Sequence, residues 1–353
     1  MLVSTEPFGT LDDGREVRRH HLDSGSGLRA TVMDHGAAIT SVIVPDRRGT
    51  PDNVVLAFPD LAGYVASGPY FGATCGRYAN RIAGARFELD GVTHQLSGNE
   101  INGNHLHGGA VGFDSVLWTA TPVPEREGRI GVAFQYVSPD GEQGYPGAVT
   151  VMTTYLVTCG NELIIDYRAT STAATPINLT NHAYWNLAGT SPGRDVLDHR
   201  LTLHCDRYLP VDGAMIPTGE LADVTGTAMD FRRGKSLGEE IAQLGDGFDC
   251  CLVVDRSDGQ TPGEGQRLPV ARVEHPASGR VMEVFSTEIA VQLYTGNGLD
   301  GQPHSGGFDR YHGVCLECSH FPDAPNQPDF PGTILRPGAT YRQTTVHRFS
   351  VMA

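Results

Sequence analysis

Lysine is almost absent from this chain of 353 residues, in which it occurs once, at Lys235. Chemistry that needs a lysine Schiff base would have to use this one residue, which lies in the polar segment FRRGKS and which we expect to be exposed. Positive charge is scarce in general: 26 lysine and arginine residues stand against 41 aspartate and glutamate residues, for a formal net charge of −15. Nucleic acids and anionic membrane surfaces are therefore poor partners, and we expect neither.

Long apolar runs are also missing. No segment approaches the roughly 18 consecutive apolar residues of a membrane-spanning helix, and the opening MLVSTEPFGTLDD lacks the apolar core of a secretion signal. The seven cysteines are odd in number and widely scattered, which does not suit a disulfide scaffold. These absences together predict a cytoplasmic protein whose thiols are reduced.

Helical periodicity is weak and is confined to two short segments, 60–66 and 236–244. Short alternating segments are abundant instead, and 44 glycines and 22 prolines separate them. Segments 149–167, 86–96 and 273–284 predict hairpins, the second around the strong turn signal Asp90-Gly91. The pattern indicates an all-β sandwich or barrel with a few short helices. Because no shift in composition marks a boundary, we expect one domain over residues 1–353.

Two motifs suggest a cofactor but lack the context that they require. Gly296 to Gly301 matches G-x-G-x-x-G, yet the following QPHSGGFDRYHG cannot form the helix on which a dinucleotide pyrophosphate would rest. His105 and His107 could share one strand face as metal ligands do. The Gly-Gly-Ala that follows them supplies no third ligand, so a pocket without a metal is the stronger interpretation.

The segment VCLECSHFPDAPNQPDF, residues 314–330, contains a CxxC pair. On a strand Cys315 and Cys318 would point to opposite faces, and no second CxxC exists to complete a metal site. Prolines rather than a helix follow the pair, which disfavours a redox motif as well. We interpret the cysteines as packing residues. Glu317 is the unusual residue, since a carboxylate late in an apolar run is rare unless it is paired or functional.

Five further polar clusters stand out from the β-strand background. They are GRYANRI at 76–82, LHGG at 106–109, NLTNHAYWNL at 178–187, GFD at 247–249 and VQLYTGN at 291–297. Amides, arginine, carboxylates and flat aromatic rings are the groups that bind the neighbouring hydroxyls of a sugar. Each cluster alone is equally typical of structural hydrogen bonding. The five together with Glu317 predict a sugar-binding pocket.

On these motifs the sequence resembles the aldose 1-epimerase (galactose mutarotase) family. The resemblance covers essentially the whole chain and runs through DLAGY, GRYANRI, LHGG, NLTNHAYWNL, YLPVDGAMIPTGE, GTAMDFR, VQLYTGN and LEC-x-x-FPDAPNQPDFP. It implies a large antiparallel β-sandwich of the galactose mutarotase type, a supersandwich, and an isomerase of free aldoses such as galactose and glucose. It also implies no metal and no organic cofactor. We expect a monomer or homodimer.

The resemblance assigns roles to single residues. Glu317 corresponds to the general base on the anomeric hydroxyl, and His182 to the general acid on the ring oxygen. The implied sugar-binding residues are Asn80, Arg81, His107, Tyr184, Asp249 and Gln292. We expect Glu317 to be ionised and His182 to be charged at rest, each stabilising the other.

Two places depart from the family pattern. Cys250 and Cys251 follow Asp249 where histidine and asparagine are usual, and Cys318 follows Glu317 where threonine is commoner. Three other functions fit parts of the same pattern: a glycoside hydrolase with Glu317 and Asp249 as its carboxyl pair, a non-catalytic sugar-binding module, and a sugar-phosphate epimerase on the same fold. The sequence leaves the preferred aldose open.

Overall fold

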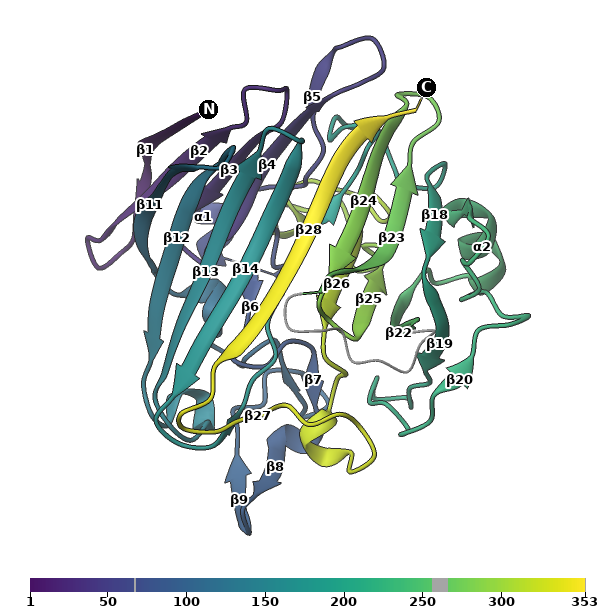
Figure 1. Ribbon diagram of the computed structural model, residues 1–353. Coiled ribbons are helices and arrows are strands. Elements are labelled where there is room, and N and C mark those ends of the chain that lie inside the picture. Colours follow the sequence, from purple (N-terminus) through teal and green to yellow (C-terminus); the bar gives the residue numbers. More distant parts are fainter. Residues whose placement is uncertain (67, 256–265, 353) are drawn as a thin grey trace.

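One large antiparallel sheet forms a layer against which two smaller sheets pack. A computed structural model describes residues 1–66, 68–255 and 266–352 (Figure 1). The nine strands of the large sheet are, in spatial order, β11 (Thr119–Arg126), β12 (Arg129–Ser138), β13 (Val149–Thr158), β14 (Glu162–Ser171), β28 (Tyr341–Val351), β24 (Arg280–Ser286), β23 (Leu268–Glu274), β18 (Arg200–Leu203) and β21 (Lys235–Ser236).

The two smaller sheets have five and six strands. The first follows chain order: β1 (Leu2–Thr10), β2 (Glu16–Asp23), β3 (Arg29–Met33), β4 (Ala38–Pro45) and β5 (Pro51–Asn53). The second has the spatial order β17 (Tyr184–Trp185), β26 (Val314–Ser319), β25 (Ala290–Tyr294), β22 (Asp249–Val254), β19 (Cys205–Leu209) and β20 (Ala222–Asp223). Both are antiparallel throughout.

Short two-stranded pairs and helices connect these sheets. The pairs are β7 (Arg81–Ile82) with β10 (His105–Leu106), β16 (Thr180–Asn181) with β6 (Thr74–Cys75), β15 (Thr175–Pro176) with β27 (Ile334–Leu335), and β8 (Arg86–Leu89) with β9 (Val92–Gln95). The helices are α1 (Leu61–Ala66) and α2 (Leu237–Leu244), so both predicted helical segments are confirmed. Among the described residues, no helix has the length and apolarity to cross a membrane.

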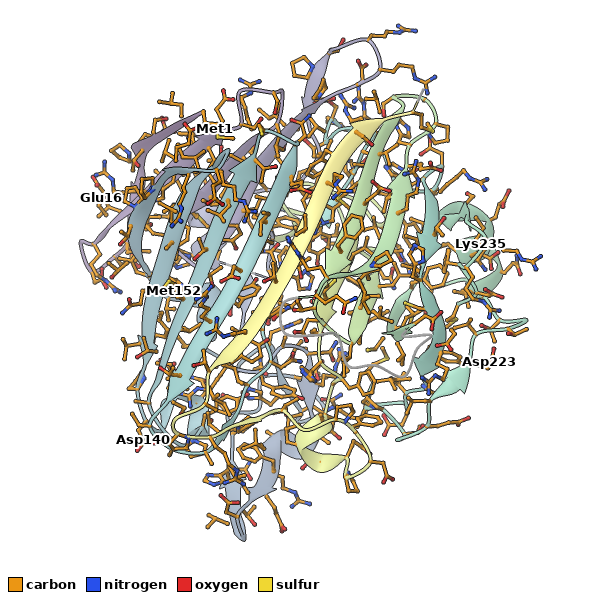
Figure 2. The ribbon with its side chains drawn as sticks, in the orientation of Figure 1. Met1, Glu16, Asp140, Met152, Asp223 and Lys235 are labelled. Carbon is orange, nitrogen blue, oxygen red and sulfur yellow. The ribbon has the colours of Figure 1, made fainter. Side chains whose placement is uncertain are left out.

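The three predicted hairpins are also confirmed, as β13–β14, β8–β9 and β23–β24. The turn between β8 and β9 shows why its sequence signal is strong. Asp90 and Gly91 both adopt positive φ, 51° and 80°, which the tight hairpin turn requires and which few residues other than glycine, asparagine and aspartate tolerate. Lys235 differs from expectation: its side chain is only 20% exposed, beside α2, and its ammonium lies 3.0 Å from Glu240 (Figure 2).

The main core lies between the sheets. Along β13, buried Val149 and Val151 alternate with the outward-facing Met152, which is 37% exposed (Figure 2). The six-stranded sheet contributes Leu293 and Leu316 to the same apolar cluster. Two packed layers sharing one core confirm the predicted β-sandwich.

The strand β26 is buried on both of its faces. Val314, Leu316 and Cys318 face the core between the sheets, whereas Cys315 and Glu317 alternate with them and face the other way. His182 and segments 68–70, 80–81, 106–107, 298–299 and 304–305 lie over this second face. The fold therefore places Glu317 between the sheet and these segments, with its side chain 5% exposed.

Candidate active site

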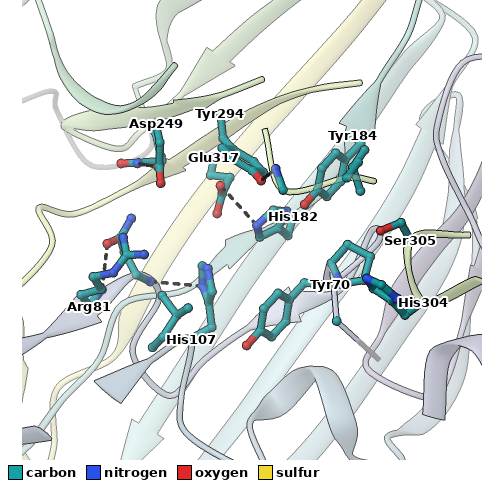
Figure 3. Close-up of a pocket in the computed structure, with 17 residues that line it drawn as sticks. Tyr70, Arg81, His107, His182, Tyr184, Asp249, Tyr294, His304, Ser305 and Glu317 are labelled. Carbon is teal, nitrogen blue, oxygen red and sulfur yellow. Dashed lines mark hydrogen bonds and ion pairs between the residues drawn. The ribbon is translucent and has the colours of Figure 1, made fainter. Parts of the chain in front are cut away.

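A cavity of about 340 Å³ lies over the second face of the six-stranded sheet (Figure 3). This volume is within the range typical of small-molecule sites. The strands β17, β22 and β26 each contribute one lining side chain and β25 contributes two, and His182 with segments 68–70, 80–81, 106–107, 298–299 and 304–305 completes the described lining. All eight residues predicted from the sequence line this cavity: Asn80, Arg81, His107, His182, Tyr184, Asp249, Gln292 and Glu317.

Strand register aligns the polar side chains of the sheet. Glu317 pairs with Gln292 across β26 and β25, and Asp249 pairs with Tyr294 two residues along β25. Because residues two apart on a strand share a face, these side chains all point into the cavity. The amide of Gln292 donates to Asp249 Oδ1 at 2.5 Å. The Oε1 atom of Gln292 is buried without a protein partner in the described part of the chain, so a ligand hydroxyl can donate to it.

His182 follows β16 and is fixed by its backbone. Its N–H donates to Ala73 O at 2.9 Å, and its carbonyl accepts the N–H of Gly72 at 3.0 Å. Gly72 has φ +65°, and a Cβ there would lie 2.0 Å from Ile39 O, so only glycine permits this close approach. The result is that the buried Nε2 of His182 lies 3.6 Å from Oε1 of Glu317 (Figure 3).

Three tyrosines surround the His182 ring. Tyr184 stacks on it with ring centroids 5.0 Å apart, Tyr70 does so at 5.7 Å, and Tyr294 approaches edge-on at 6.3 Å. Aromatic faces exclude water from the imidazole, yet they attract a cation through their quadrupoles. The cage therefore favours a neutral ring in the resting site, and it offers some compensation when the ring gains a proton.

Burial determines the charge of the two central groups. It lowers the pKa of His182 to about 4. It also raises the pKa of Glu317 well above its usual range, helped by the charge of Asp249 and opposed by Arg81. The expectation that His182 is charged at rest is therefore wrong, and the upward shift in the pKa of Glu317 disfavours the ionised form that was also expected. Removing two charges from water is costly, so burial favours a protonated carboxyl group beside a neutral imidazole over an ion pair across 3.6 Å.

Asn80 holds His107 in place through two hydrogen bonds. Both His107 and Asn80 have left-handed backbones, with φ 49° and 62°, and the two residues exchange bonds. The N–H of His107 donates to Asn80 O at 3.1 Å, and the N–H of Asn80 donates to His107 Nδ1 at 3.2 Å. Burial lowers the pKa of His107 well below its usual range, so the ring is neutral. Since Nδ1 accepts, the ring proton is on Nε2, which acts as a donor.

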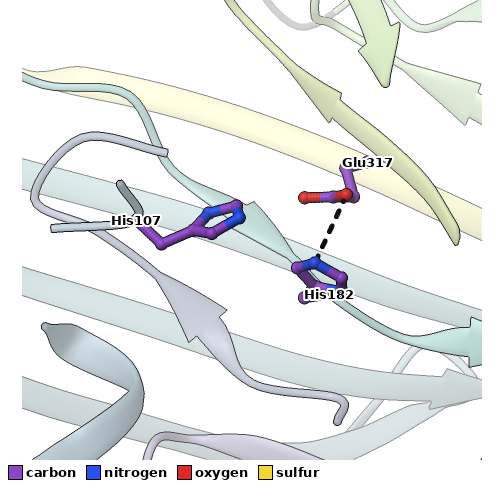
Figure 4. Close-up of side chains that lie close together, drawn as sticks. All are labelled: His107, His182 and Glu317. Carbon is purple, nitrogen blue, oxygen red and sulfur yellow. Dashed lines mark ion pairs between the residues drawn. The ribbon is translucent and has the colours of Figure 1, made fainter. Parts of the chain in front are cut away.

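The ligand atoms of His107, His182 and Glu317 lie within 4.8 Å of one another, as metal ligands do (Figure 4). A histidine that binds a metal normally donates its other ring N–H to an acceptor. In His107 the arrangement is reversed, because Nδ1 already accepts from the backbone and Nε2 therefore carries the proton. The donor set consequently does not fit a metal ion without loss of that hydrogen bond.

Arg81 is positioned by a residue that the sequence analysis missed. Its Nε lies 3.0 Å from both carboxylate oxygens of Glu100, and its Nη2 lies 2.9 Å from Oε1. Both side chains are largely buried, at 14% and 16% exposure. A forked, charge-assisted contact of this kind fixes the plane of a guanidinium. Glu100 comes from an irregular loop, where no local pattern marks it.

Tyr70, Tyr294 and Cys315 were also missed. The alternation of β25 could have identified Tyr294, two residues after Gln292, and that of β26 could have identified Cys315, two residues before Glu317. Tyr70 lies in a loop with φ 57°, and only the tertiary fold brings it to the site.

In each of the two cysteine pairs, the two side chains lie on opposite faces of their strand. Cys315 and Cys318 point to opposite sides of β26 as predicted, and the sulfur of Cys315 lies 3.5 Å from Nδ1 of His182. Of the unusual Cys250-Cys251 pair, Cys250 packs in the core between the sheets. Cys251 lies opposite Gln292 in the register and packs in a separate apolar cluster with Phe321.

The sequence and the fold were compared with those of known proteins. A family model described as aldose 1-epimerase matches residues 18–348. The human protein named galactose mutarotase is 45% identical over 357 residues, covering 99% of each chain, and the aldose 1-epimerase of Escherichia coli K12 is 36% identical over 96% of each. A crystal structure of galactose 1-epimerase from Lactobacillus acidophilus superposes with a TM-score of 0.86 at 25% identity, covering 100% of this chain and 99% of that one.

Proposed function

The chain belongs to the aldose 1-epimerase family, and we propose that it interconverts the α and β anomers of free aldoses, with Glu317 as general base and His182 as general acid. The observation that carries this assignment is the buried contact of 3.6 Å between Glu317 Oε1 and His182 Nε2 on the floor of a sugar-sized cavity. A base and an acid this close can serve the two oxygens attached to the anomeric carbon.

The reaction requires two coupled proton transfers and no electron transfer. Glu317 removes the proton of the anomeric hydroxyl as the bond between C1 and the ring oxygen breaks, and His182 gives a proton to that ring oxygen. The anomeric oxygen thereby becomes the aldehyde oxygen. Rotation about C1–C2 presents the other carbonyl face, and the same transfers run backward to close the ring. Positioned acid–base catalysis of this kind typically contributes about 10²–10⁴-fold per group.

The protonation states of the resting pair are compatible with these roles. In this proposal Glu317 and His182 share one exchangeable proton, and burial favours its position on the carboxyl group at rest. The reactive form has the same total charge, with that proton on Nε2 of His182. Sugar hydroxyls that donate to Glu317 stabilise its ionised form, so substrate binding favours the transfer. The pair therefore titrates as a unit, and activity requires that it hold one proton.

The remaining residues bind the sugar in our proposal. Gln292 and Asp249 offer neighbouring acceptors for vicinal hydroxyls, and Asn80 and Arg81 offer donors from the opposite wall. His107 directs its Nε2–H toward the region of His182, where it can donate to the ring oxygen or an adjacent hydroxyl. Tyr184 packs against His182 and limits the angle from which the sugar can approach.

A sugar phosphate fits this pocket less well than a free sugar. The lining includes the carboxyl groups of Asp249 and Glu317, and Arg81 is the one arginine or lysine among its described residues. That guanidinium is already paired with Glu100. A phosphate would thus meet no unpaired arginine or lysine among the described residues of the lining.

A glycoside hydrolase is also disfavoured, because its two carboxyl groups must flank the scissile bond. Here Glu317 and Asp249 project from the same face of one sheet.

Polarimetry of fresh α-D-galactose and α-D-glucose tests the proposal. We expect the wild type to accelerate the change in rotation, and Glu317→Gln and His182→Asn each to lower kcat by about 10²–10⁴-fold. Glu125→Gln makes the same chemical change on the exposed part of β11 and should leave the rate unaltered. A wild type that binds galactose but leaves anomerisation at the buffer rate would show instead a sugar-binding module, and hydrolysis of aryl glycosides without anomerisation would show a hydrolase.

We further propose that the chain acts as one domain, as a monomer or homodimer in the cytoplasm. The even spread of acidic residues along the sequence supports a single highly charged, freely diffusing enzyme. Light scattering coupled to size exclusion would distinguish a particle of 37.8 kDa from one of twice that mass.

A further inference from the structure

The proposed acid, His182, has a second contact on the side of its ring that faces away from Glu317. Nδ1 of His182 lies 3.5 Å from Sγ of Cys315, and both groups are buried. The register places Cys315 between Tyr184 and Tyr294, the two sheet tyrosines whose rings also contact His182. The sulfur is thus part of the surface on which the imidazole rests.

We propose that Cys315 is a positioning residue for His182, whose Nδ1–H it accepts at every stage of the reaction. The inference rests on the proposed function, because it assumes that Nε2 of His182 exchanges a proton with substrate. It assigns to the first cysteine of the CxxC pair a role that packing alone does not describe.

Counting protons fixes the direction of this hydrogen bond. When the shared proton is on Glu317, the carboxyl group faces the lone pair of Nε2, so the neutral ring carries its proton on Nδ1. When the shared proton has moved to His182, both ring nitrogens are protonated. After Nε2 gives its proton to the sugar ring oxygen, the ring is again neutral with its proton on Nδ1. Nδ1 is therefore a donor in all three states and needs a partner that only accepts.

A thiol donating to Nδ1 would give the wrong tautomer. The neutral ring would then carry its proton on Nε2, and release of that proton to the sugar would leave an imidazolate, which is not accessible near neutral pH. Burial raises the pKa of Cys315 well above its usual range, so the group remains a thiol whose sulfur lone pairs are available. The sulfur is a weak acceptor, sufficient to orient the ring.

A weak acceptor such as the Cys315 sulfur is compatible with the role of His182 as a proton donor. A carboxylate at Nδ1 would stabilise the imidazolium and make it a poorer proton donor. The side chains that face His182 in the described chain are Glu317, His107, Cys315 and the three tyrosines Tyr70, Tyr184 and Tyr294, and a hydrogen bond with its own backbone also raises its pKa. Glu317 is the one carboxyl group among them, and it lies at Nε2. Among the described residues, the strong charge partner of His182 is consequently on the side where the proton is exchanged.

Three variants on one strand test the proposal. Cys315→Ala removes the acceptor, and we expect kcat to fall about tenfold with KM changed less than about twofold, since loss of one hydrogen bond leaves the ring free to tilt. Cys315→Ser keeps an acceptor and should recover most of that loss. Cys318→Ala removes a sulfur of equal size from the opposite face of β26 and should leave kcat unaltered. Equal losses in Cys315→Ala and Cys318→Ala would indicate a general packing effect and overturn the proposal.

The pH profile and nitrogen NMR give independent readouts. Without the acceptor the imidazolium is less stable, so the acid limb of the kcat profile should move to lower pH in Cys315→Ala and return in Cys315→Ser. In the wild type, the ¹⁵N shift of His182 Nδ1 should be that of a protonated nitrogen across the neutral range. An unprotonated Nδ1 would overturn the proposal even if the enzyme is active. A wild type without mutarotase activity would refute the proposed function, whereas the NMR result would still report the tautomer.

Discussion

The strands β13 and β26 belong to antiparallel sheets of the same sandwich but bury their side chains differently. Along β13, apolar residues such as Val151 alternate with outward-facing ones such as Met152. Along β26, every residue from Val314 to Ser319 is buried. The outer face of β13 meets solvent, whereas loops that carry His107 and His182 cover the second face of β26. The two strands therefore represent two uses of burial, one for stability and one for chemistry.

This difference has an energetic meaning. Between the sheets, burial of apolar surface lowers the free energy of the folded chain by about 25 cal/mol for each Å². In the pocket, burial shifts the pKa of Glu317 upward and that of His182 downward, which is unfavourable for their charged forms. Substitutions in the core between the sheets should therefore lower stability more than substitutions in the pocket. Substitutions in the pocket should lower activity more than substitutions in the core.

Glu317→Gln should separate the two uses most clearly. We expect kcat to fall by about 10²–10⁴-fold while the melting temperature does not fall. Folding raises the pKa of Glu317, so the stability that its proton contributes is fully present below the unfolded pKa and is lost as the pH rises through the folded value. Glutamine does not ionise, and the variant should gain stability relative to the wild type at alkaline pH. A large loss of stability in urea unfolding would contradict this reading of the pocket.

Phe134→Ala should show the reverse behaviour. Phe134 is fully buried in β12 and packs edge-on against Tyr155 at 6.0 Å. Its truncation should lower the free energy of unfolding by about 3–5 kcal/mol, measured by urea titration. The kcat of the protein that remains folded should be unchanged. Phe134→Leu, which keeps most of the volume, serves as the milder control, and a selective loss of kcat in either variant would break the comparison.

Glu100→Gln should affect binding more than chemistry. It keeps the shape of the side chain but removes the charge that fixes Arg81 through contacts of 2.9 and 3.0 Å. We expect KM for galactose to rise about tenfold and kcat to change little, because Arg81 is placed at the sugar rather than at the proton-transfer pair. Glu142→Gln, which alters a carboxylate outside the pocket lining, is the matched control. An effect confined to kcat would place Arg81 at the reacting atoms instead.

His347→Phe should give the smallest effect of these substitutions, a change in the pH dependence of stability without a change in kcat. Burial lowers the pKa of His347 to about 3, and its ring packs against Trp185 at 4.7 Å. The unfolded chain binds this proton below its ordinary pKa of 6.5, so stability is complete above that pH and declines as the pH falls toward about 3. Phenylalanine should flatten this decline in urea titrations without altering kcat. An unchanged slope would show that His347 is not responsible.

The sequence predicts much of this architecture because its signals are local. The Asp90-Gly91 turn, the alternation of 149–157 and the short helix at 237–244 each depend on neighbours within a few residues. The eight predicted site residues all line one cavity, and long motifs in the sequence carried them. Glu100 and Tyr70 were not found, since they lie in loops that only the folded chain brings to the pocket. The charge of His182 was predicted wrongly and the rise in the pKa of Glu317 was not foreseen, because burial is not visible in a motif.

The sequence by itself determined the strand pattern, the face of β26 on which Glu317 lies, and the separation of Cys315 from Cys318. These follow from the period of two along a strand, which is a property of the backbone. The tertiary structure alone decided that His182 comes within 3.6 Å of Glu317, that three tyrosines enclose it, and that a cysteine sulfur meets its Nδ1. Proximity of distant segments and exclusion of water arise only when the layers pack, and they set the proton positions on which the proposed reaction depends.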